Sequence, residues 1–198
     1  MATGRWSINL LLARVKPLVA AYRWCGYKVR TMSRIAPSSI DSVREFELAD
    51  LAATEALARR LALVARVGDV IAVSGGLGAG KTAFARAFIR ARTGASPALE
   101  VPSPTFTLVQ LYELPGAPVW HFDLYRLVAA EEAWELGLEE ALAEAITLIE
   151  WPQRLGPLLP VERLDVALLP GRSPSSRRVR IAGHGERGRQ LAEAIADA

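Results

Sequence analysis

Apolar positions along the chain recur at two spacings, one typical of helices and the other of strands. Apolar residues at helical spacing predict helices at Ala49–Val67, Lys81–Arg92, Glu131–Ala145 and Glu186–Ala196. Short apolar or alternating runs predict strands at Val70–Val73, Val119–Phe122, Ile146–Ile149, Leu164–Leu169 and Arg178–Ile181. The segment Pro102–Tyr112 alternates apolar and polar positions, which predicts an extended strand or a hairpin.

The order of these elements indicates the fold class. Strands that alternate with helices, the first of them wholly apolar, predict an α/β fold with a largely parallel sheet covered by helices. The last two strands are separated only by the turn-rich segment Pro170–Ser176, so we expect them to be antiparallel. We divide the chain into a basic N-terminal extension, residues 1–42, and one folded domain, residues 43–198.

Composition excludes several classes of protein and site. The chain has 198 residues and is 51% hydrophobic and 23% charged, which is typical of a globular domain. Its single cysteine, Cys25, excludes an internal disulfide and a cysteine-cluster zinc site, and only His121 and His184 are available as imidazole ligands. The longest apolar runs, near the N-terminus, are interrupted by Arg14 and Lys16, so we expect no membrane span and a cytoplasmic location.

The positive charge is concentrated at the N-terminus. Residues 1–40 contain seven basic side chains and no acidic one, whereas the remainder has 17 basic and 21 acidic residues. The folded domain is therefore mildly acidic, and the net charge of +3 does not indicate an RNA-binding surface on it. Three interpretations of the basic segment remain open: an organelle-targeting peptide, a misread start with translation beginning at Met32, or an arm that contacts RNA or a membrane.

The segment Gly75–Thr82 fits the phosphate-loop pattern G-x-x-x-x-G-K-T between a predicted strand and a predicted helix. Glycines allow the backbone to turn and to approach a phosphate closely, while the N-terminus of the helix offers N–H donors and a partial positive charge. Lys81 is expected to reach the β- and γ-phosphates, and the Thr82 hydroxyl to bind Mg²⁺. The alternative is a tight glycine-rich turn with a surface lysine.

Two acidic residues follow predicted strands and could complete a magnesium site. Asp123 follows Val119–Phe122, and Glu150 follows Ile146–Ile149. Ligands bind at the carboxyl ends of parallel strands, and Mg²⁺ takes one or two carboxylates. The chain has no Asn/Thr-Lys-x-Asp motif for guanine, which favours ATP as the nucleotide.

These motifs together resemble those of the bacterial TsaE (YjeE) family, the P-loop ATPases required for tRNA threonylcarbamoyladenosine modification. The resemblance runs from about Glu47 to Ile181 and excludes the basic segment. The Ser-Pro-Thr-Phe-Thr, Phe-Asp-Leu-Tyr-Arg-Leu and Glu-Trp-Pro blocks are more specific than the phosphate loop alone. The matching segments are Gly76–Thr82, Val101–Leu108, His121–Leu127, Glu135–Leu138 and Leu148–Pro152.

The resemblance implies a three-layer P-loop NTPase fold and a role for each matching residue. Lys81 would bind phosphate, Thr82 and Glu150 would hold Mg²⁺, and Asp123 would polarise the metal's water shell or the attacking water. Thr105 would sense the γ-phosphate, and Thr54 would contact the nucleotide from the first helix. A late-strand arginine, Arg172 or Arg177, would contact the base. The expected nucleotide-contacting set is Thr54, Gly78, Ala79, Gly80, Lys81, Thr82, Ala83, Thr105 and Arg172.

The resemblance also implies partners and leaves two rival functions open. ATP binding and hydrolysis would reset the TsaB–TsaD transferase pair, with tRNA contacted only indirectly and no membrane involved. Arg126 is a candidate arginine finger, although a structural ion pair is the commoner role of such a residue. The rivals are a small-molecule kinase, which the short segment Pro152–Arg163 disfavours because it offers little room for a lid, and an adaptor that senses ATP without hydrolysing it.

Overall fold

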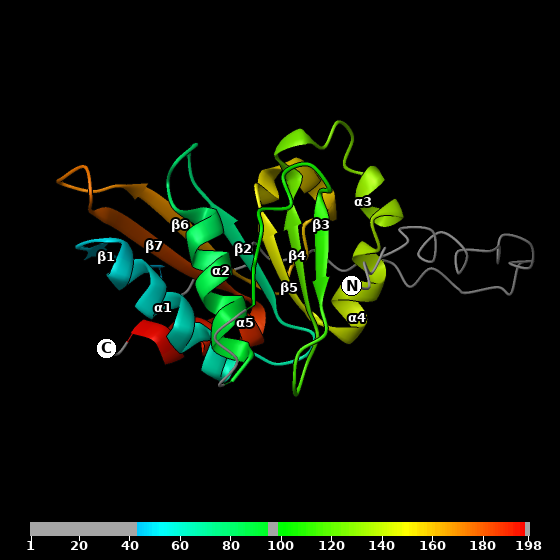
Figure 1. The fold of residues 1–198 in the computed structure, drawn as a ribbon, viewed down its shortest axis with the longest axis horizontal. Helices are drawn as coiled ribbons and strands as arrows, with labels where there is room; N and C mark the ends of the chain where they lie inside the picture. The colour runs from blue at the N-terminus through cyan, green and yellow to red at the C-terminus, as the bar shows by residue number, and fades with distance from the viewer. Residues whose placement is uncertain (1–42, 95–98, 197–198) are drawn as a thin grey trace, which may run out of the picture. The chain divides into compact units, whose positions relative to one another are not determined.

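A computed structural model describes residues 43–94 and 99–196 (Figure 1). They form one seven-stranded sheet with the strand order β1-β7-β6-β2-β5-β4-β3. The strands are β1 (Val43–Leu48), β2 (Val70–Ser74), β3 (Val109–Tyr112), β4 (Val119–Asp123), β5 (Ile146–Glu150), β6 (Arg163–Pro170) and β7 (Arg177–His184). The helices are α1 (Leu51–Val64), α2 (Lys81–Arg92), α3 (Glu132–Glu135), α4 (Leu138–Glu144) and α5 (Gly185–Ala196), with 3₁₀ segments η2 (Leu124–Arg126) and η3 (Pro152–Leu158).

The centre of the sheet is parallel and its margins are antiparallel. Strands β6, β2, β5 and β4 run in the same direction, while β3, β7 and β1 pair in the opposite sense with their neighbours. The predicted α/β class and the antiparallel late strands are confirmed. Because β2, β5 and β4 are adjacent and parallel, their carboxyl ends meet at one edge of the sheet.

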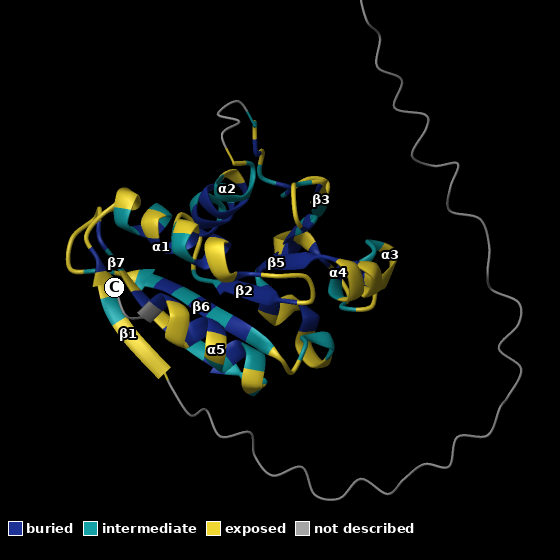
Figure 2. Cartoon of the chain, turned by 90° about the horizontal axis from the view of Figure 1, so that it is seen from below, coloured by how far each residue is buried: buried dark blue, intermediate teal, exposed yellow. Residues whose placement is uncertain are grey.

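Two hydrophobic clusters lie on opposite faces of the sheet. Each joins the sheet to a layer of helices, so the fold has three layers. The first cluster joins alternate strand residues to α1, α2 and α5, and the second joins the intervening strand residues to α3, α4, η2 and η3. In β2, Ile71 and Val73 belong to the first cluster, whereas Val70 belongs to the second. Figure 2 shows β2 and β5 coloured as buried between the helices. This burial of both faces is why these strands are apolar throughout.

Helix α1 buries only part of the apolar face that its spacing suggests. Asp50 caps its N-terminus, where Oδ1 accepts a 2.8 Å hydrogen bond from the backbone N–H of Ala53. Leu51 is 55% exposed and Val64 is exposed as well. The buried positions are Thr54, Leu57, Ala58, Leu61 and Ala62. Small residues turn inward because α1 packs closely against α2 and the sheet.

Two predicted elements have different bounds in the structure, and one strand was not predicted. The helix expected over Glu131–Ala145 is divided into α3 and α4 at Gly137, which has a left-handed φ of +86°. The stretch Pro102–Tyr112 is extended only from Val109, because its first part forms turns beside the sheet. Strand β1 was not predicted, and it pairs along its whole length with β7. These differences depend on contacts between segments that are distant in sequence.

In the part of the chain that the structure describes, no helix combines the length and the hydrophobicity that a membrane crossing requires. The basic segment lies within residues 1–42, outside the described residues. Its three interpretations therefore stay predictions.

Candidate functional site

A pocket of about 260 Å³ lies where β2, β4 and β5 end, directly against the start of α2. It receives side chains from the loop after β2, from the turn before β3, and from the last residues of β4 and β5 and the residues that follow them. The lining residues are Leu77, Gly78, Gly80, Lys81, Thr82, Ala83, Thr105, Asp123, Tyr125, Glu150 and Trp151. The sequence had placed most of its candidate residues at this edge.

The loop between β2 and α2 turns tightly because two glycines occupy positions that other residues would strain. At Gly75, which has a φ of +144°, an added Cβ would lie 2.5 Å from the carbonyl oxygen of Leu168 on β6. Gly80 caps α2 with a left-handed φ of +104°. The loop therefore passes close to β6 and delivers the N-terminus of α2 to the pocket. Backbone N–H groups at such a terminus attract anions.

Lys81 begins α2 and is only 5% exposed. Its Nζ donates hydrogen bonds to the carbonyl oxygens of Gly75 at 3.0 Å and Gly76 at 2.8 Å. The same Nζ lies 4.0 Å from the ring centroid of Trp151, a cation–π distance. Burial lowers the pKa of the Lys81 ammonium below its ordinary value, while the carboxylates of Glu150 and Asp123 act in the opposite direction.

Glu150 and Thr82 form the second part of the site. Oγ1 of Thr82 donates a hydrogen bond of 3.0 Å to Oε2 of Glu150. The other carboxylate oxygen, Oε1, lies 2.9 Å from Nε2 of the buried residue His121. Glu150 is itself only 2% exposed. The two carboxylate oxygens therefore face different partners within the protein.

Asp123 lies beside Glu150 because β4 and β5 pair in register at these two residues. Its Oδ2 accepts hydrogen bonds from the hydroxyls of Thr105 at 2.5 Å and Ser103 at 3.3 Å. Its Oδ1 accepts one from the backbone N–H of Tyr125 at 3.2 Å. Asp123 is thus the point where the segment before β3 is attached to the pocket.

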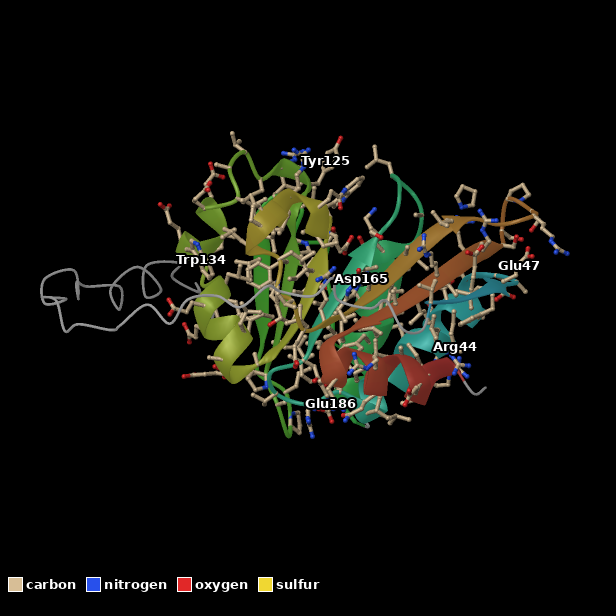
Figure 3. The ribbon with its side chains drawn as sticks, turned by 180° about the vertical axis from the view of Figure 1, so that it is seen from behind. Arg44, Glu47, Tyr125, Trp134, Asp165 and Glu186 are labelled. Carbon is tan, nitrogen blue, oxygen red and sulfur yellow. The ribbon has the colours of Figure 1, made fainter. Side chains whose placement is uncertain are left out.

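The pocket assembles eight of the predicted residues and leaves three outside its lining. Ala79 lies on the loop but does not line the pocket. Thr54 is buried within α1, where its hydroxyl donates to the carbonyl oxygen of Asp50. The Arg172 side chain is 93% exposed and pairs with Glu47. Figure 3 shows Glu47 well apart from Tyr125, which lines the pocket.

The alternative arginine, Arg177, lies directly against the loop. Its Nε donates a 3.0 Å hydrogen bond to the carbonyl oxygen of Ala79, and its Nη2 lies 3.3 Å from that of Gly78. The geometry therefore favours Arg177 over Arg172 as the late-strand arginine nearest the site. Arg126, considered as an arginine finger, instead lies 4.3 Å from the ring centroid of Phe106.

Sequence reasoning missed Ser103, Tyr125 and Leu77 as parts of the site. Ser103 and Tyr125 both lie within the specific sequence blocks, which was the available signal. Trp151 also lines the pocket, with its ring centroid 5.0 Å from that of Tyr125. Its left-handed φ of +60° is strained for a tryptophan. This backbone turn directs the chain from β5 into η3.

The oxygens of Thr82 and Glu150 suit a hydrated magnesium ion. Mg²⁺ binds oxygen ligands octahedrally at about 2.0–2.1 Å, which sets adjacent ligands about 2.9 Å apart. The 3.0 Å separation between Thr82 Oγ1 and Glu150 Oε2 matches that spacing. Across the described ranges 43–94 and 99–196, no group of three or more His, Cys, Asp and Glu side chains could form a protein-only metal site. The two oxygens therefore fit a metal whose other ligands are water and phosphate.

Comparison with known proteins identifies the family of this chain. A family model described as "Threonylcarbamoyl adenosine biosynthesis protein TsaE" matches residues 48–179, more than half of the chain. The chain belongs to the TsaE family. Membership assigns it to the biosynthesis of threonylcarbamoyladenosine in tRNA.

Individual relatives support the same assignment. A protein of Rickettsia bellii named tRNA threonylcarbamoyladenosine biosynthesis protein TsaE is 41% identical over 115 residues, which cover 58% of this chain and 78% of the relative. A protein of the same name from Bacillus subtilis is 37% identical over 116 residues, 58% of this chain and 70% of the relative. The crystal structure of Bacillus subtilis YdiB superposes with a TM-score of 0.62 and 26% identity, covering 78% of this chain and 95% of YdiB.

Proposed function

We propose that this TsaE-family protein binds and hydrolyses ATP with Mg²⁺ and thereby supports the TsaB–TsaD transferase pair, which modifies adenosine 37 of tRNA. One observation carries the proposal. A single pocket contains the phosphate loop with Lys81, the Thr82–Glu150 oxygen pair and the adjacent carboxylate of Asp123. Anion-binding backbone, a cation and a magnesium ligand pair are the parts that phosphoryl transfer requires.

Lys81 would change partners when nucleotide binds. Its Nζ is held by two loop carbonyls and lies over Trp151. A phosphate oxygen bound in the loop would take the place of these carbonyl oxygens as the acceptor. Hydrogen bonds in which both donor and acceptor are charged are stronger than those to a neutral carbonyl. Thr82 and Glu150 would hold the metal through the two oxygens that now bond each other. Bound Mg²⁺ would neutralise charge on the β- and γ-phosphates.

Asp123 would position the attacking water. Its carboxylate lies one strand from Glu150 and is buried, so its oxygens are held in fixed directions. Thr105 and Ser103 would release Oδ2 as their loop responds to the γ-phosphate. Within the described residues, no arginine lines the pocket. We therefore expect slow hydrolysis by the protein alone and faster hydrolysis when a partner supplies the missing positive charge.

The test measures ATP turnover by the full chain, alone and with the TsaB–TsaD pair from the same source. We expect the pair to accelerate turnover and Lys81→Ala to abolish both rates. Arg59→Ala is the matched control, since Arg59 lies on the exposed face of α1 and, among the described residues, forms an ion pair with Glu55 alone. A rate of ATP turnover that is the same with and without the pair would contradict the proposed partner. Consumption of ATP only when a metabolite is added would indicate a kinase.

Asp123→Asn separates an ATPase from an adaptor that senses ATP. The amide retains the shape of the side chain but loses the negative charge that orients water. An ATPase would keep nucleotide affinity and lose hydrolysis and its support of modification. An adaptor would keep affinity and still support modification in full.

A further inference from the structure

The carboxylate of Glu150 is held from two sides, and only one side faces the pocket. Thr82 occupies Oε2 at 3.0 Å, and His121 occupies Oε1 at 2.9 Å. Glu150 is 2% exposed and His121 is 0% exposed, so water does not compete for the bond between these two residues. A carboxylate bound in this way cannot rotate to present both oxygens to the same point.

The His121 ring has no role visible in the structure other than this hydrogen bond and its packing. It lies on β4 two residues before Asp123 and therefore on the same face of the strand. It does not line the pocket. Its second nitrogen, Nδ1, is buried and makes no hydrogen bond to any described residue. Because Nε2 faces a carboxylate oxygen, Nε2 carries the hydrogen and donates it.

We propose that His121 is a positioning residue that restricts Glu150 to a single metal-binding oxygen. This restriction would make the site select Mg²⁺ over Ca²⁺, and the inference rests on the proposed function. Mg²⁺ takes six ligands at about 2.0–2.1 Å, whereas Ca²⁺ takes about 6–8 at roughly 2.3–2.6 Å and accepts carboxylates through both oxygens. With Oε1 held by His121, Glu150 offers Oε2 alone. Mg²⁺ needs only one oxygen from Glu150 and keeps its full set of ligands, whereas Ca²⁺ is denied the second carboxylate oxygen as a ligand.

Three substitutions separate the hydrogen bond from the bulk of the ring. His121→Leu keeps an apolar side chain in the buried space and leaves Oε1 free to turn toward the metal. In His121→Gln, the amide nitrogen reaches about as far as Nε2 and can donate to Oε1. In His121→Asn, the shorter amide ends near the position of Nδ1 and cannot reach Oε1. Gln and Asn are therefore a matched pair with the same chemistry and different reach.

The experiment measures the affinity of the full chain for a non-hydrolysable ATP analogue by calorimetry, with Mg²⁺, with Ca²⁺ and with no divalent cation. Loss of a group that orients a metal ligand typically costs about 10–100-fold, so we expect a loss of that size with Mg²⁺ in His121→Leu and His121→Asn. Affinity with Ca²⁺ should fall less, which lowers the preference for Mg²⁺. Affinity without metal should stay unchanged in every variant. His121→Gln should retain the wild-type preference.

The outcomes distinguish this inference from the proposed function. If wild type binds the analogue with Mg²⁺ and His121→Leu shows the same preference for Mg²⁺, His121 only packs and the inference is overturned, while the proposed function stands. If His121→Leu does not fold, equal preferences in His121→Gln and His121→Asn overturn it instead. A wild-type protein that binds no nucleotide overturns both.

Discussion

The hydroxyl of Thr105 lies 2.5 Å from Oδ2 of Asp123, although 18 residues separate the two in sequence. The bond joins the segment before β3 to the carboxyl end of β4. Ser103 reaches the same oxygen at 3.3 Å. An aspartate that orients water in an ATPase needs this oxygen free. The position of this segment and the availability of Asp123 are therefore linked, which is the physical form that a nucleotide-dependent switch would take here.

We expect Thr105→Val to weaken discrimination between ATP and ADP. Valine has nearly the same shape but offers no hydroxyl to Asp123 or to a γ-phosphate. A hydrogen bond to a charged group is worth about 1.5–3 kcal/mol, so the ratio of the two affinities should fall about tenfold or more. Calorimetric titration with ADP and with a non-hydrolysable ATP analogue measures this ratio of affinities. Ser103→Ala, which removes the longer bond, should have a smaller effect, and equal effects would contradict the assignment.

The buried ammonium of Lys81 should make stability depend on pH in the alkaline range. Its pKa is below the ordinary 10.5 in the folded state because of burial. Between the lowered pKa and 10.5, the unfolded chain binds more protons, so the free energy of unfolding rises with pH. Urea unfolding of wild type and Lys81→Met should show wild type gaining stability relative to the variant in this window. A difference that does not change with pH would contradict this.

The contact between Arg187 and Asp69 should be important for stability. Asp69 is 2% exposed and accepts hydrogen bonds from Nε of Arg187 at 2.8 Å and from Nη2 at 2.7 Å. Arg187→Met leaves a buried carboxylate without its cation, and we expect the free energy of unfolding to fall by about 3–5 kcal/mol. Arg59→Met removes an exposed ion pair and should cost no more than about 0.5 kcal/mol. Chemical denaturation compares the two variants.

Gly137 should tolerate alanine less well than Gly68. Both have a φ of +86°, so alanine costs about 1–2 kcal/mol of backbone strain at either position. At Gly137 the new Cβ would lie 2.8 Å from the ring of Trp120, whereas nothing lies within 4 Å at Gly68. We expect about 1–3 kcal/mol of further destabilisation at Gly137, measured by urea unfolding. Equal losses would show that Trp120 moves aside freely.

Local signals predicted the phosphate loop and its helix accurately. Helix α2 spans Lys81–Arg92, as predicted, because glycines precede it and a breaker-rich stretch follows. Strands β2, β4 and β5 were predicted to within one residue, because a short apolar run between turn signals is compatible with few structures other than a buried strand. The acidic residues that end β4 and β5 could be identified because parallel strands carry ligand-binding groups at their carboxyl ends.

Other features depended on contacts that no local pattern contains. Gly137 divides the predicted helix where Trp120 of β4 approaches it, and β1 is a strand because β7 offers it a partner. The spacing of apolar residues in α1 could not reveal which face α2 would cover.

The sequence by itself determined the family, the phosphate loop and the acidic residues of the site, because these are local motifs with a fixed spacing. Only the tertiary structure decided which groups hold those residues. The register between β4 and β5 places Asp123 beside Glu150. The approach of β7 to the loop brings Arg177, and not Arg172, against Ala79. Hydrogen bonds between distant segments follow from how strands pair and helices pack, and a linear pattern does not specify these.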